Sequence, residues 1–383
     1  MKITGIICEY NPLHLGHKKQ LDLLRADNPD GGIVCLMSGN FVQRGKPAII
    51  DKSLRAKAAI LCGADLVLEL PPTAALRSAE GFAQEGVRIL GSFCDQLCFG
   101  AENADADMLN KAAQLLLSDA FSPALRTQLE TGLSFPAARQ KALEQLGLHG
   151  DWLLAPNNIL ALEYCKAIIL QKSKMSVFPN AREGSYHETA PDSENPSATA
   201  VRKLMQAHMP YQAYIPEQSY NCFKNAPLHA LSYAERAILA KLRTMRDAEF
   251  ESLPFGSEGL WRKLMHACRK EATLEEIMQS VKSKRYTRSR LDRMVMCAFL
   301  GLTEQDLAQP APYARVLALN DRGRQILNLA RKSGHFPNAG EKVDLPYQEL
   351  EDRLGALYGL FQANTLPSPD LESNRRVCFI NEK

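Results

Sequence analysis

The sequence has no hydrophobic run long enough to span a membrane. Among its 383 residues, every apolar stretch is interrupted by charged residues within the length that a membrane-spanning helix requires. The apolar run at the N-terminus meets an acidic residue and a proline instead of a small-residue cleavage site, which is not typical of a secretion signal. We therefore expect a cytoplasmic protein.

Clustered cysteines and a strong net charge are also lacking. The ten cysteines are scattered, and the one close pair, Cys94 and Cys98, has no second pair or histidine pair at zinc-finger spacing. We interpret them as reduced, mostly buried thiols. The formal net charge of +3 is too small to indicate a partner by itself, so the distribution of charge along the chain matters more.

Short β-branched runs alternate with helical stretches in the first half of the chain, which is the pattern of a parallel sheet covered by helices. Strands are expected at residues 3–8, 32–37, 65–70, 96–99 and 174–182. Helices are expected at residues 18–25, 53–62, 79–90, 104–146 and 156–171, and from about Ser197 onward. The fold class that follows is α/β, with a doubly wound parallel sheet.

The length favours two domains, because one hydrophobic core seldom grows to 383 residues. A stretch with prolines and scattered polar residues at 211–227 is the candidate boundary. Residues 1–220 are therefore expected to form the α/β domain and residues 221–383 a mainly helical one. Capping-box spacing predicts two helix starts in the second domain, Ser232 with Glu235 and Thr273 with Glu276.

Two histidines lie where the first strand should turn into the first helix, which is the crevice where ligands bind in an open α/β sheet. Gly16 allows close approach of a phosphate, and the helix N-terminus offers free N–H groups. His14 and His17 can donate hydrogen bonds to phosphate oxygens. The pattern favours a nucleotide whose α-phosphate is attacked, with both histidines stabilising the developing charge. The same pair could instead bind a metal or cap the helix.

Two further groups of polar residues are expected at the same end of the sheet. Ser197, Thr199 and Arg202 suit a second anion site at a helix start, although an ordinary N-cap with a surface arginine is the common explanation of such a pattern. Asn157 and Asn158 also stand at a helix start, where one can cap the helix and the other can read an adenine edge.

The loop after the second expected strand has the composition of a substrate loop. Residues 38–48 hold two glycines, two cations and two amides at the same end of the sheet. The candidate contacts are Ser38, Gly39, Asn40, Gln43 and Arg44.

Seven motifs in the same order resemble the bacterial tRNA(Met) cytidine acetate ligases, a family within the HIGH-type nucleotidyltransferase superfamily. The motifs lie at residues 9–17, 38–48, 65–71, 98–102, 156–160, 197–199 and 284–288. The resemblance implies a Rossmann-like nucleotidyltransferase fold and an enzyme that uses ATP to convert acetate to acetyl-adenylate, with release of pyrophosphate. The acetyl group would then pass to the N4 amine of the wobble cytidine of elongator tRNA(Met), giving N4-acetylcytidine.

The resemblance also assigns an ATP site by position. It implies ATP contacts from Gly100, from Arg182 and from either Asn157 or Asn158. It further implies a contact loop made of Ile7, Cys8, Glu9, Tyr10, Asn11, Pro12, Leu13, His14, Leu15, Gly16, His17, Lys18, Lys19 and Gln20. One departure is Leu15, where the family often has a polar residue, so a nucleotide contact is missing if that side chain faces the ligand.

The excess positive charge lies in the second domain, where residues 262–293 hold ten Lys or Arg and four acids. Within this stretch Tyr286 is interleaved with cations. That pattern suits phosphate contacts and a stacked base of single-stranded RNA, although charge runs are usually solvated helix faces. The candidate tRNA contacts are Lys282, Lys284, Arg285, Tyr286, Arg288 and Arg290.

ATP is therefore the expected co-substrate, with acetate and tRNA as the other substrates. Mg2+ is expected beside the ATP phosphates, but no carboxylate cluster in the sequence identifies its ligands. Two alternatives stay open. One is a small-molecule nucleotidyltransferase of cofactor synthesis, against which the basic second half argues. The other is a non-catalytic RNA-binding protein, against which the intact histidines argue.

Overall fold

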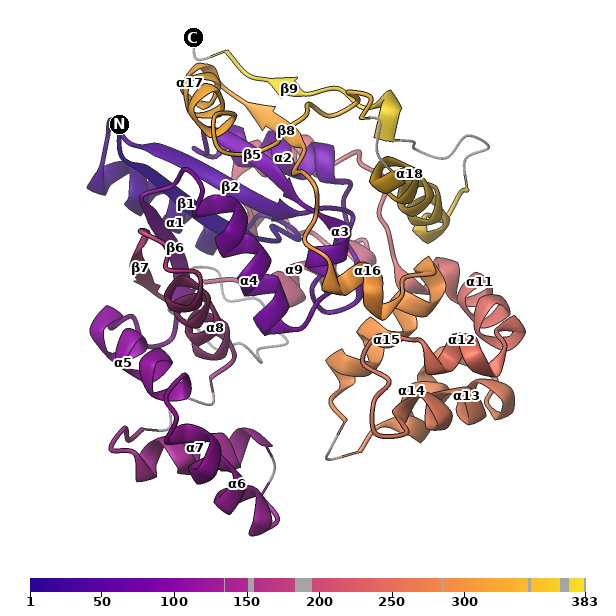
Figure 1. The fold of residues 1–383 in the computed structure, drawn as a ribbon. Helices are drawn as coiled ribbons and strands as arrows, with labels where there is room; N and C mark the ends of the chain where they lie inside the picture. Colours follow the sequence, from indigo (N-terminus) through magenta and orange to yellow (C-terminus); the bar gives the residue numbers. More distant parts are fainter. Residues whose placement is uncertain are drawn as a thin grey trace.

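The computed structural model in Figure 1 has a central sheet with helices on both faces and two further groups of helices at its sides. The structure describes residues 1–133, 135–150, 155–182, 195–283, 286–343, 346–365 and 372–381.

Seven strands form the main sheet, in the order β7-β6-β1-β2-β5-β8-β9. Their bounds are β1 Ile3–Cys8, β2 Gly32–Ser38, β5 Leu66–Leu70, β6 Gln96–Ala101, β7 Ser176–Ala181, β8 Val316–Leu319 and β9 Cys378–Phe379. Neighbouring strands run parallel except β5 and β8, which are antiparallel. This confirms the predicted doubly wound parallel sheet, to which β8 adds a strand antiparallel to β5.

Helices cover the sheet on both faces, so its central strands β1, β2 and β5 are almost wholly buried. In β2, Val34 and Leu36 belong to the core that includes residues of α4 Ala79–Leu90, α8 Pro156–Leu170 and α17 Asp321–Ala330. Ile33 and Cys35 belong to the core on the other face, with residues of α1 Leu15–Asp27 and α2 Lys52–Leu61. Alternate residues of each strand therefore face opposite layers of helices.

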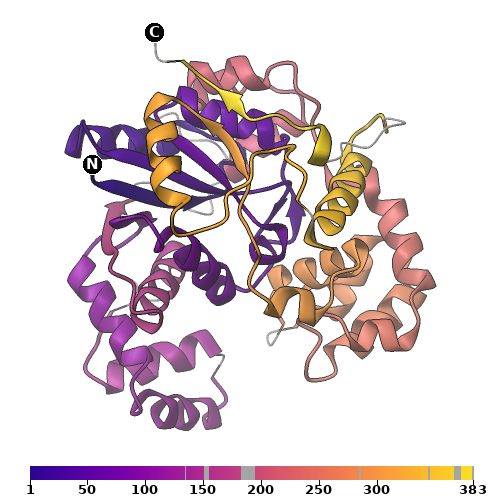
Figure 2. The ribbon, with the colours of Figure 1, turned by 45° about the horizontal axis from the view of Figure 1, so that its top comes forward.

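The remaining helices form two side groups and a few connections. The first group is α5 Ala106–Leu116, α6 Phe121–Glu130 and α7 Phe135–Gln145. The second, called here the helical unit, is α11 Leu231–Thr244, α12 Asp247–Glu251, α13 Leu260–Lys270, α14 Leu274–Val281, α15 Arg288–Leu300, α16 Glu304–Ala308 and α18 Pro346–Tyr358. Figure 2 shows these groups at opposite sides of the sheet. The connecting helices are α3 Pro72–Ala75, α9 Ala198–Gln206 and α10 Glu217–Phe223.

The chain returns to the sheet after the helical unit. Strands β8 and β9 and helix α17 all come from beyond residue 220, so a division there does not account for the complete sheet. A short hairpin, β3 Phe41–Val42 and β4 Lys46–Pro47, also joins the two parts, because Phe41 lies in the core of the helical unit. The boundary at residue 220 therefore stays a prediction.

One of the two predicted capping boxes is confirmed. Thr273 caps α14 and shares a reciprocal capping box with Glu276. The box at Ser232 is wrong, because α11 already begins at Leu231. Glu235 instead accepts a hydrogen bond from the backbone N–H of Leu274 at 2.8 Å, a tertiary contact that local spacing does not reveal. None of the helices in the described parts of the chain is long and apolar enough to cross a membrane.

Candidate functional site

A cavity of about 510 Å³ opens at the carboxyl ends of β1 and β6. The chain order reverses between these two neighbouring strands, since β1 leads to β2 and β5 on one side and β6 leads to β7 on the other. Such a switch point is where open α/β sheets bind ligands. The N-terminal residues of α8 and α9 complete the wall, so three helix starts face one cavity.

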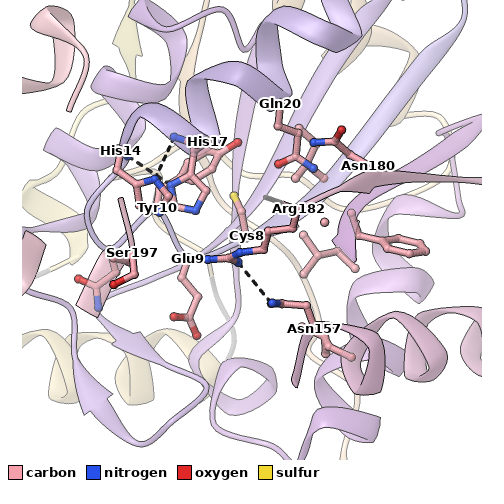
Figure 3. Close-up of a pocket in the computed structure, with 18 of the residues that line it drawn as sticks. Cys8, Glu9, Tyr10, His14, His17, Gln20, Asn157, Asn180, Arg182 and Ser197 are labelled. Carbon is pink, nitrogen blue, oxygen red and sulfur yellow. Dashed lines mark hydrogen bonds between the residues drawn. The ribbon is translucent and has the colours of Figure 1, made fainter. Parts of the chain in front are cut away.

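His14 and His17 lie at the start of α1 and face this cavity (Figure 3). His14 is the N-cap residue, and its Nδ1 accepts a hydrogen bond from the backbone N–H of Gly16 at 3.1 Å. His17 Nδ1 accepts from the backbone N–H of His14 at 3.3 Å, and the two rings stack with centroids 3.8 Å apart. An imidazole that accepts at Nδ1 carries its proton at Nε2 when it is neutral. Each ring therefore presents an Nε2–H donor.

The surroundings keep both histidines neutral. Burial, with further contributions from His17, Arg182 and Arg202, holds the pKa of His14 well below its usual value. Burial and Arg182 lower the pKa of His17 to about 3. The Nε2 atom of His14 is buried and has no hydrogen-bond partner among the described residues. An unsatisfied donor of this kind is costly, and an anionic ligand in the cavity would satisfy it.

The neutral state of His14 predicts a loss of stability in mild acid. A histidine whose pKa is lowered by folding binds a proton more readily when unfolded, so stability falls as the pH drops below about 6.5. Each such histidine contributes at most about 1.4 kcal/mol per pH unit. We expect urea unfolding of His14→Asn to depend less on pH between 5.5 and 7.5 than that of the wild type. The matched control is exposed His208→Asn, which should keep the wild-type pH dependence. An unchanged slope in His14→Asn would contradict the neutral assignment.

The opposite wall of the cavity carries Asn157 and Arg182. Arg182 donates to Oδ1 of Asn157 at 3.3 Å (Figure 3). Nδ2 of Asn157 donates to Glu102 at 2.7 Å. Asn158 is fully buried, does not line the cavity, and accepts from the backbone N–H of Asn103. The structure thus places Asn157, and not Asn158, where a ligand can be contacted.

Ser197 and Thr199 lie at the start of α9 and also line the cavity. Ser197 is an ordinary N-cap, whose Oγ accepts from the backbone N–H of Ala200 at 3.1 Å. Arg202 donates to Oγ1 of Thr199 at 3.0 Å and to the backbone carbonyl of Asn11 at 2.6 Å. The arginine therefore ties the start of α9 to the loop that precedes His14.

The structure divides the expected contact loop into two sets. The members that line the cavity are Ile7, Cys8, Glu9, Tyr10, Asn11, His14, Gly16, His17, Lys19 and Gln20. The members that do not are Pro12, Leu13, Leu15 and Lys18. Leu13 is fully buried in the core, and Leu15 does not line the cavity, so the family departure at Leu15 removes no contact that this cavity offers.

Gly100 lies on the cavity wall at the end of β6, paired with Asn180 of β7. A Cβ added to Gly100 would meet no atom within 4 Å. We expect Gly100→Val to fold with unchanged stability and to raise the KM for ATP by about tenfold or more, because its methyl groups would occupy ligand space. Gly359→Val is the matched control, since a Cβ there also meets open space but lies outside the cavity. An unaltered KM for ATP in Gly100→Val would show that the nucleotide binds elsewhere.

Only part of the expected substrate loop reaches the cavity. Gln43 and Arg44 line it, and the backbone N–H of Gln43 donates to Glu9 at 3.0 Å. The other three candidates are buried in the protein. The carbonyl of Gly39 accepts from Arg55, Oδ1 of Asn40 accepts from the backbone N–H of Lys52, and Oγ of Ser38 is buried without a partner among the described residues. These three residues shape the loop and do not contact the cavity.

The expected RNA-stacking role of Tyr286 is wrong in this structure. The side chain is 4% exposed and lies in the core of the helical unit. Its hydroxyl donates to the carbonyl of Glu258, and its ring packs beneath Arg290, so neither is available to a base. Arg288 binds Glu275 and Asp292, whereas Lys282 is exposed. Lys284 and Arg285 lie outside the described residues.

Sequence reasoning missed two parts of the cavity. Asn180 lines it from the end of β7, and Phe82, Phe99 and Tyr164 form an apolar wall. Asn180 stands in an otherwise ordinary strand, and the aromatic residues fit core positions of their elements, so no local signal separated them from structural residues. The position of Asn180 opposite Gly100 could have been found only by knowing the strand order.

Three comparisons with known proteins agree with this geometry. A family model described as HIGH Nucleotidyl Transferase matches residues 1–352. A tRNA(Met) cytidine acetate ligase from Clostridium tetani is 36% identical over 360 residues, covering 88% of this chain and 89% of that protein. One from Clostridium acetobutylicum is 35% identical over 406 residues, covering 99% and 100%.

Two solved structures share the whole fold. The apo crystal structure of Thermotoga maritima TmcAL superposes with a TM-score of 0.91 at 28% sequence identity, with both chains covered completely. A second form of that protein, bound with alpha-thio ATP, gives a TM-score of 0.88 with the same identity and coverage.

Proposed function

Because the chain belongs to the HIGH nucleotidyl transferase family, among the tRNA(Met) cytidine acetate ligases, we propose that it acetylates the wobble cytidine of elongator tRNA(Met). ATP and acetate are the other substrates, and acetyl-adenylate is the intermediate. The observation that carries the proposal is the pair of neutral histidines that line a cavity at the switch point of the sheet, each with its proton at Nε2.

The first step joins acetate to AMP. A carboxylate oxygen of acetate attacks the α-phosphorus of ATP, the bond to the bridging oxygen breaks, and pyrophosphate leaves. Negative charge grows on the phosphate oxygens during this displacement, so fixed hydrogen-bond donors lower the barrier. His14 and His17 supply such donors. Each neutral ring carries its proton at Nε2, so it donates a hydrogen bond to the phosphate and keeps the proton. Arg182 adds positive charge from the opposite wall.

The second step transfers the acetyl group. The N4 amine of cytidine attacks the acetyl carbonyl carbon, a carbon–nitrogen bond forms, the bond to the AMP oxygen breaks, and the amine loses one proton to solvent. The acyl-adenylate is already activated, so holding the amine close to it supplies much of the acceleration. The helical unit, with its excess of Lys and Arg, is the side of the molecule on which the tRNA binds. A tRNA substrate places the enzyme in the cytoplasm.

Mg2+ would be held in this site mainly by the phosphates of ATP and not by a set of protein ligands. No group of three His, Cys, Asp or Glu in the described parts of the chain could hold a metal ion. Glu9 is the one acidic residue among the described residues that line the cavity. Mg2+ commonly binds ATP phosphates, several waters and one or two carboxylates. Glu9 would hold the ion, and the ion would neutralise phosphate charge.

The proposal is tested by incubating the protein with ATP, labelled acetate and unmodified elongator tRNA(Met), followed by nucleoside mass spectrometry. We expect labelled N4-acetylcytidine at the wobble position and none in a transcript carrying uridine there. Acetate-dependent release of pyrophosphate without RNA acetylation would keep the adenylation step and indicate another acceptor, as in a small-molecule nucleotidyltransferase. No pyrophosphate release with any carboxylic acid would indicate a non-catalytic RNA-binding protein.

A further inference from the structure

The β3–β4 hairpin connects the cavity with the first turns of α15. Arg44 is exposed in the hairpin turn and lines the cavity. The next residue, Gly45, has a φ of +69° and touches α15, since an added Cβ would lie 2.5 Å from the backbone nitrogen of Arg293. Lys46 Nζ then binds Asp292 at 2.8 Å. One rigid turn therefore joins the ATP site to the helical unit.

Positive charge is in excess at this junction. Apart from Arg44, the described residues here include four cations, Lys46, Arg288, Arg290 and Arg293, and the carboxylates that bind Lys46 and Arg288 are Asp292 and Glu275. Asp292 is bound by both Lys46 and Arg288, and Glu275 by Arg288. Arg290 instead donates to the carbonyl of Phe255 and the hydroxyl of Ser257, which leave its charge uncompensated.

Arg293 is the least compensated member of this group. Its side chain is 8% exposed, and its Nε is buried without a hydrogen-bond partner among the described residues. The guanidinium lies over the ring of Phe255, 4.9 Å from the centroid, and no ion pair holds it in the described parts of the chain. Burial, with contributions from Arg290 and Arg44 and against the opposing effects of Cys297 and Asp292, lowers the pKa of Arg293 to about 10, so the side chain stays charged at neutral pH.

A buried cation without a carboxylate is expensive, and an anion that arrives with a substrate offsets that cost. Two phosphate sources are available, the backbone of the RNA and the β,γ-phosphates of ATP. Arg293 does not line the ATP cavity, whereas Arg44 does. The anion must therefore extend from the cavity out to α15. A phosphodiester chain does so, because its phosphates lie several ångströms from the base that enters the cavity.

We propose that Arg44 and Arg293 form a clamp for a backbone phosphate of the RNA next to the reacting cytidine. The inference rests on the proposed function and names the residues that position its second substrate. Because Gly45 fixes Arg44 against α15, binding of the phosphate places the cytidine at the mouth of the cavity that holds the acyl-adenylate. Arg44 and Arg293 are positioning residues and take no part in the chemistry.

The two half-reactions distinguish the RNA from ATP as the source of the phosphate. Acetate-dependent exchange of pyrophosphate into ATP reports adenylation without RNA, and acetylation of tRNA reports both steps. We expect Arg293→Met to leave exchange unchanged and to raise the KM for tRNA about tenfold, with kcat nearly retained. The variant should be as stable as the wild type, since replacing an uncompensated buried charge by an apolar side chain is often neutral or stabilising. An equal loss in exchange would overturn the clamp and assign Arg293 to the ATP phosphates.

Salt dependence provides a second readout. Removing one phosphate contact to single-stranded RNA should reduce the slope of log affinity against log salt by about 0.7. We expect this change in Arg293→Met and also in Arg44→Ala, an exposed position that packing does not constrain. Arg236→Met removes an exposed cation of α11 and should keep the wild-type slope and KM. Wild-type values in the first two variants, or equal changes in Arg236→Met, would overturn the proposal. A wild-type enzyme inactive on tRNA would instead contradict the proposed function.

Discussion

The His14→Asn variant should fold like the wild-type protein and form acetyl-adenylate about a hundredfold more slowly, or worse. Asparagine is a preferred N-cap, so its side-chain oxygen can accept the Gly16 N–H that Nδ1 of His14 accepts in the wild type. Its side chain ends there and offers no donor at the position of Nε2. The measurement is acetate-dependent pyrophosphate exchange, with urea unfolding as the check on folding.

Comparing His14→Ala with His14→Asn separates the helix-capping role of His14 from its role as a hydrogen-bond donor to the phosphate. Alanine removes both the cap and the donor, so His14→Ala should lose about the same activity as His14→Asn and about 1 kcal/mol more stability. His17→Ala should slow exchange to a similar degree, because the imidazole of His17 lines the same cavity. Exchange near the wild-type rate in His14→Asn would show that His14 is only a helix cap.

The α/β core could be predicted from sequence because its strands are buried on both faces and read as short apolar runs between helical patterns. Strand β1 and helix α4 were predicted with the bounds that the structure has, and α1, β2, α2, β5 and β6 within three residues. The helical stretch expected at 104–146 is divided into α5, α6 and α7, and the short elements β3, β4 and α3 were not predicted. Strands β8 and β9 were missed, because they have four and two residues and their pairing depends on partners hundreds of positions away.

The site could be predicted where it depends on local chemistry. The strand-to-helix turn with its histidines and the cap at Ser197 were recognisable, because the residue types themselves suit a phosphate at a helix start. Tyr286 and Asn158 show the limit of this reasoning. Both belong to motifs rich in polar groups, yet both are buried, because burial is decided by elements that pack from elsewhere in the chain.

The second large effect is expected at Lys52, in a buried ionic cluster beneath the hairpin. Lys52 Nζ binds Glu69 and Glu372, each at 2.6 Å, and all three side chains are at most 4% exposed. Arg375 binds Glu372 at 3.2 Å and both oxygens of Asp51. Burial alone would lower the pKa of Lys52, but Glu372 and Glu69 raise it above its usual value. The cluster thus holds the C-terminal segment, through Glu372 and Arg375, against β5 and α2.

Lys52→Met should lower the free energy of unfolding by about 3–5 kcal/mol at pH 8, because the buried carboxylates of Glu69 and Glu372 then lose the cation that they share. In the wild type, Lys52 and Arg375 overcome burial and hold the pKa of Glu372 below its usual value, so that carboxylate stabilises the fold above about pH 4.5. In the variant, burial raises the carboxylate pKa values. The deficit should therefore be smaller at pH 5 than at pH 8.

The measurement is urea unfolding at both pH values, with Lys141→Met as the matched control. Lys141 binds Glu144 at the surface, where an ion pair is worth about 0–1 kcal/mol. Equal unfolding midpoints for the two variants would show that the buried cluster does not stabilise the fold. The backbone N–H of Lys52 also holds Asn40, which precedes the hairpin that carries Arg44. Loss of the cluster should therefore weaken tRNA binding together with stability, whereas loss of Arg44 alone should weaken binding only.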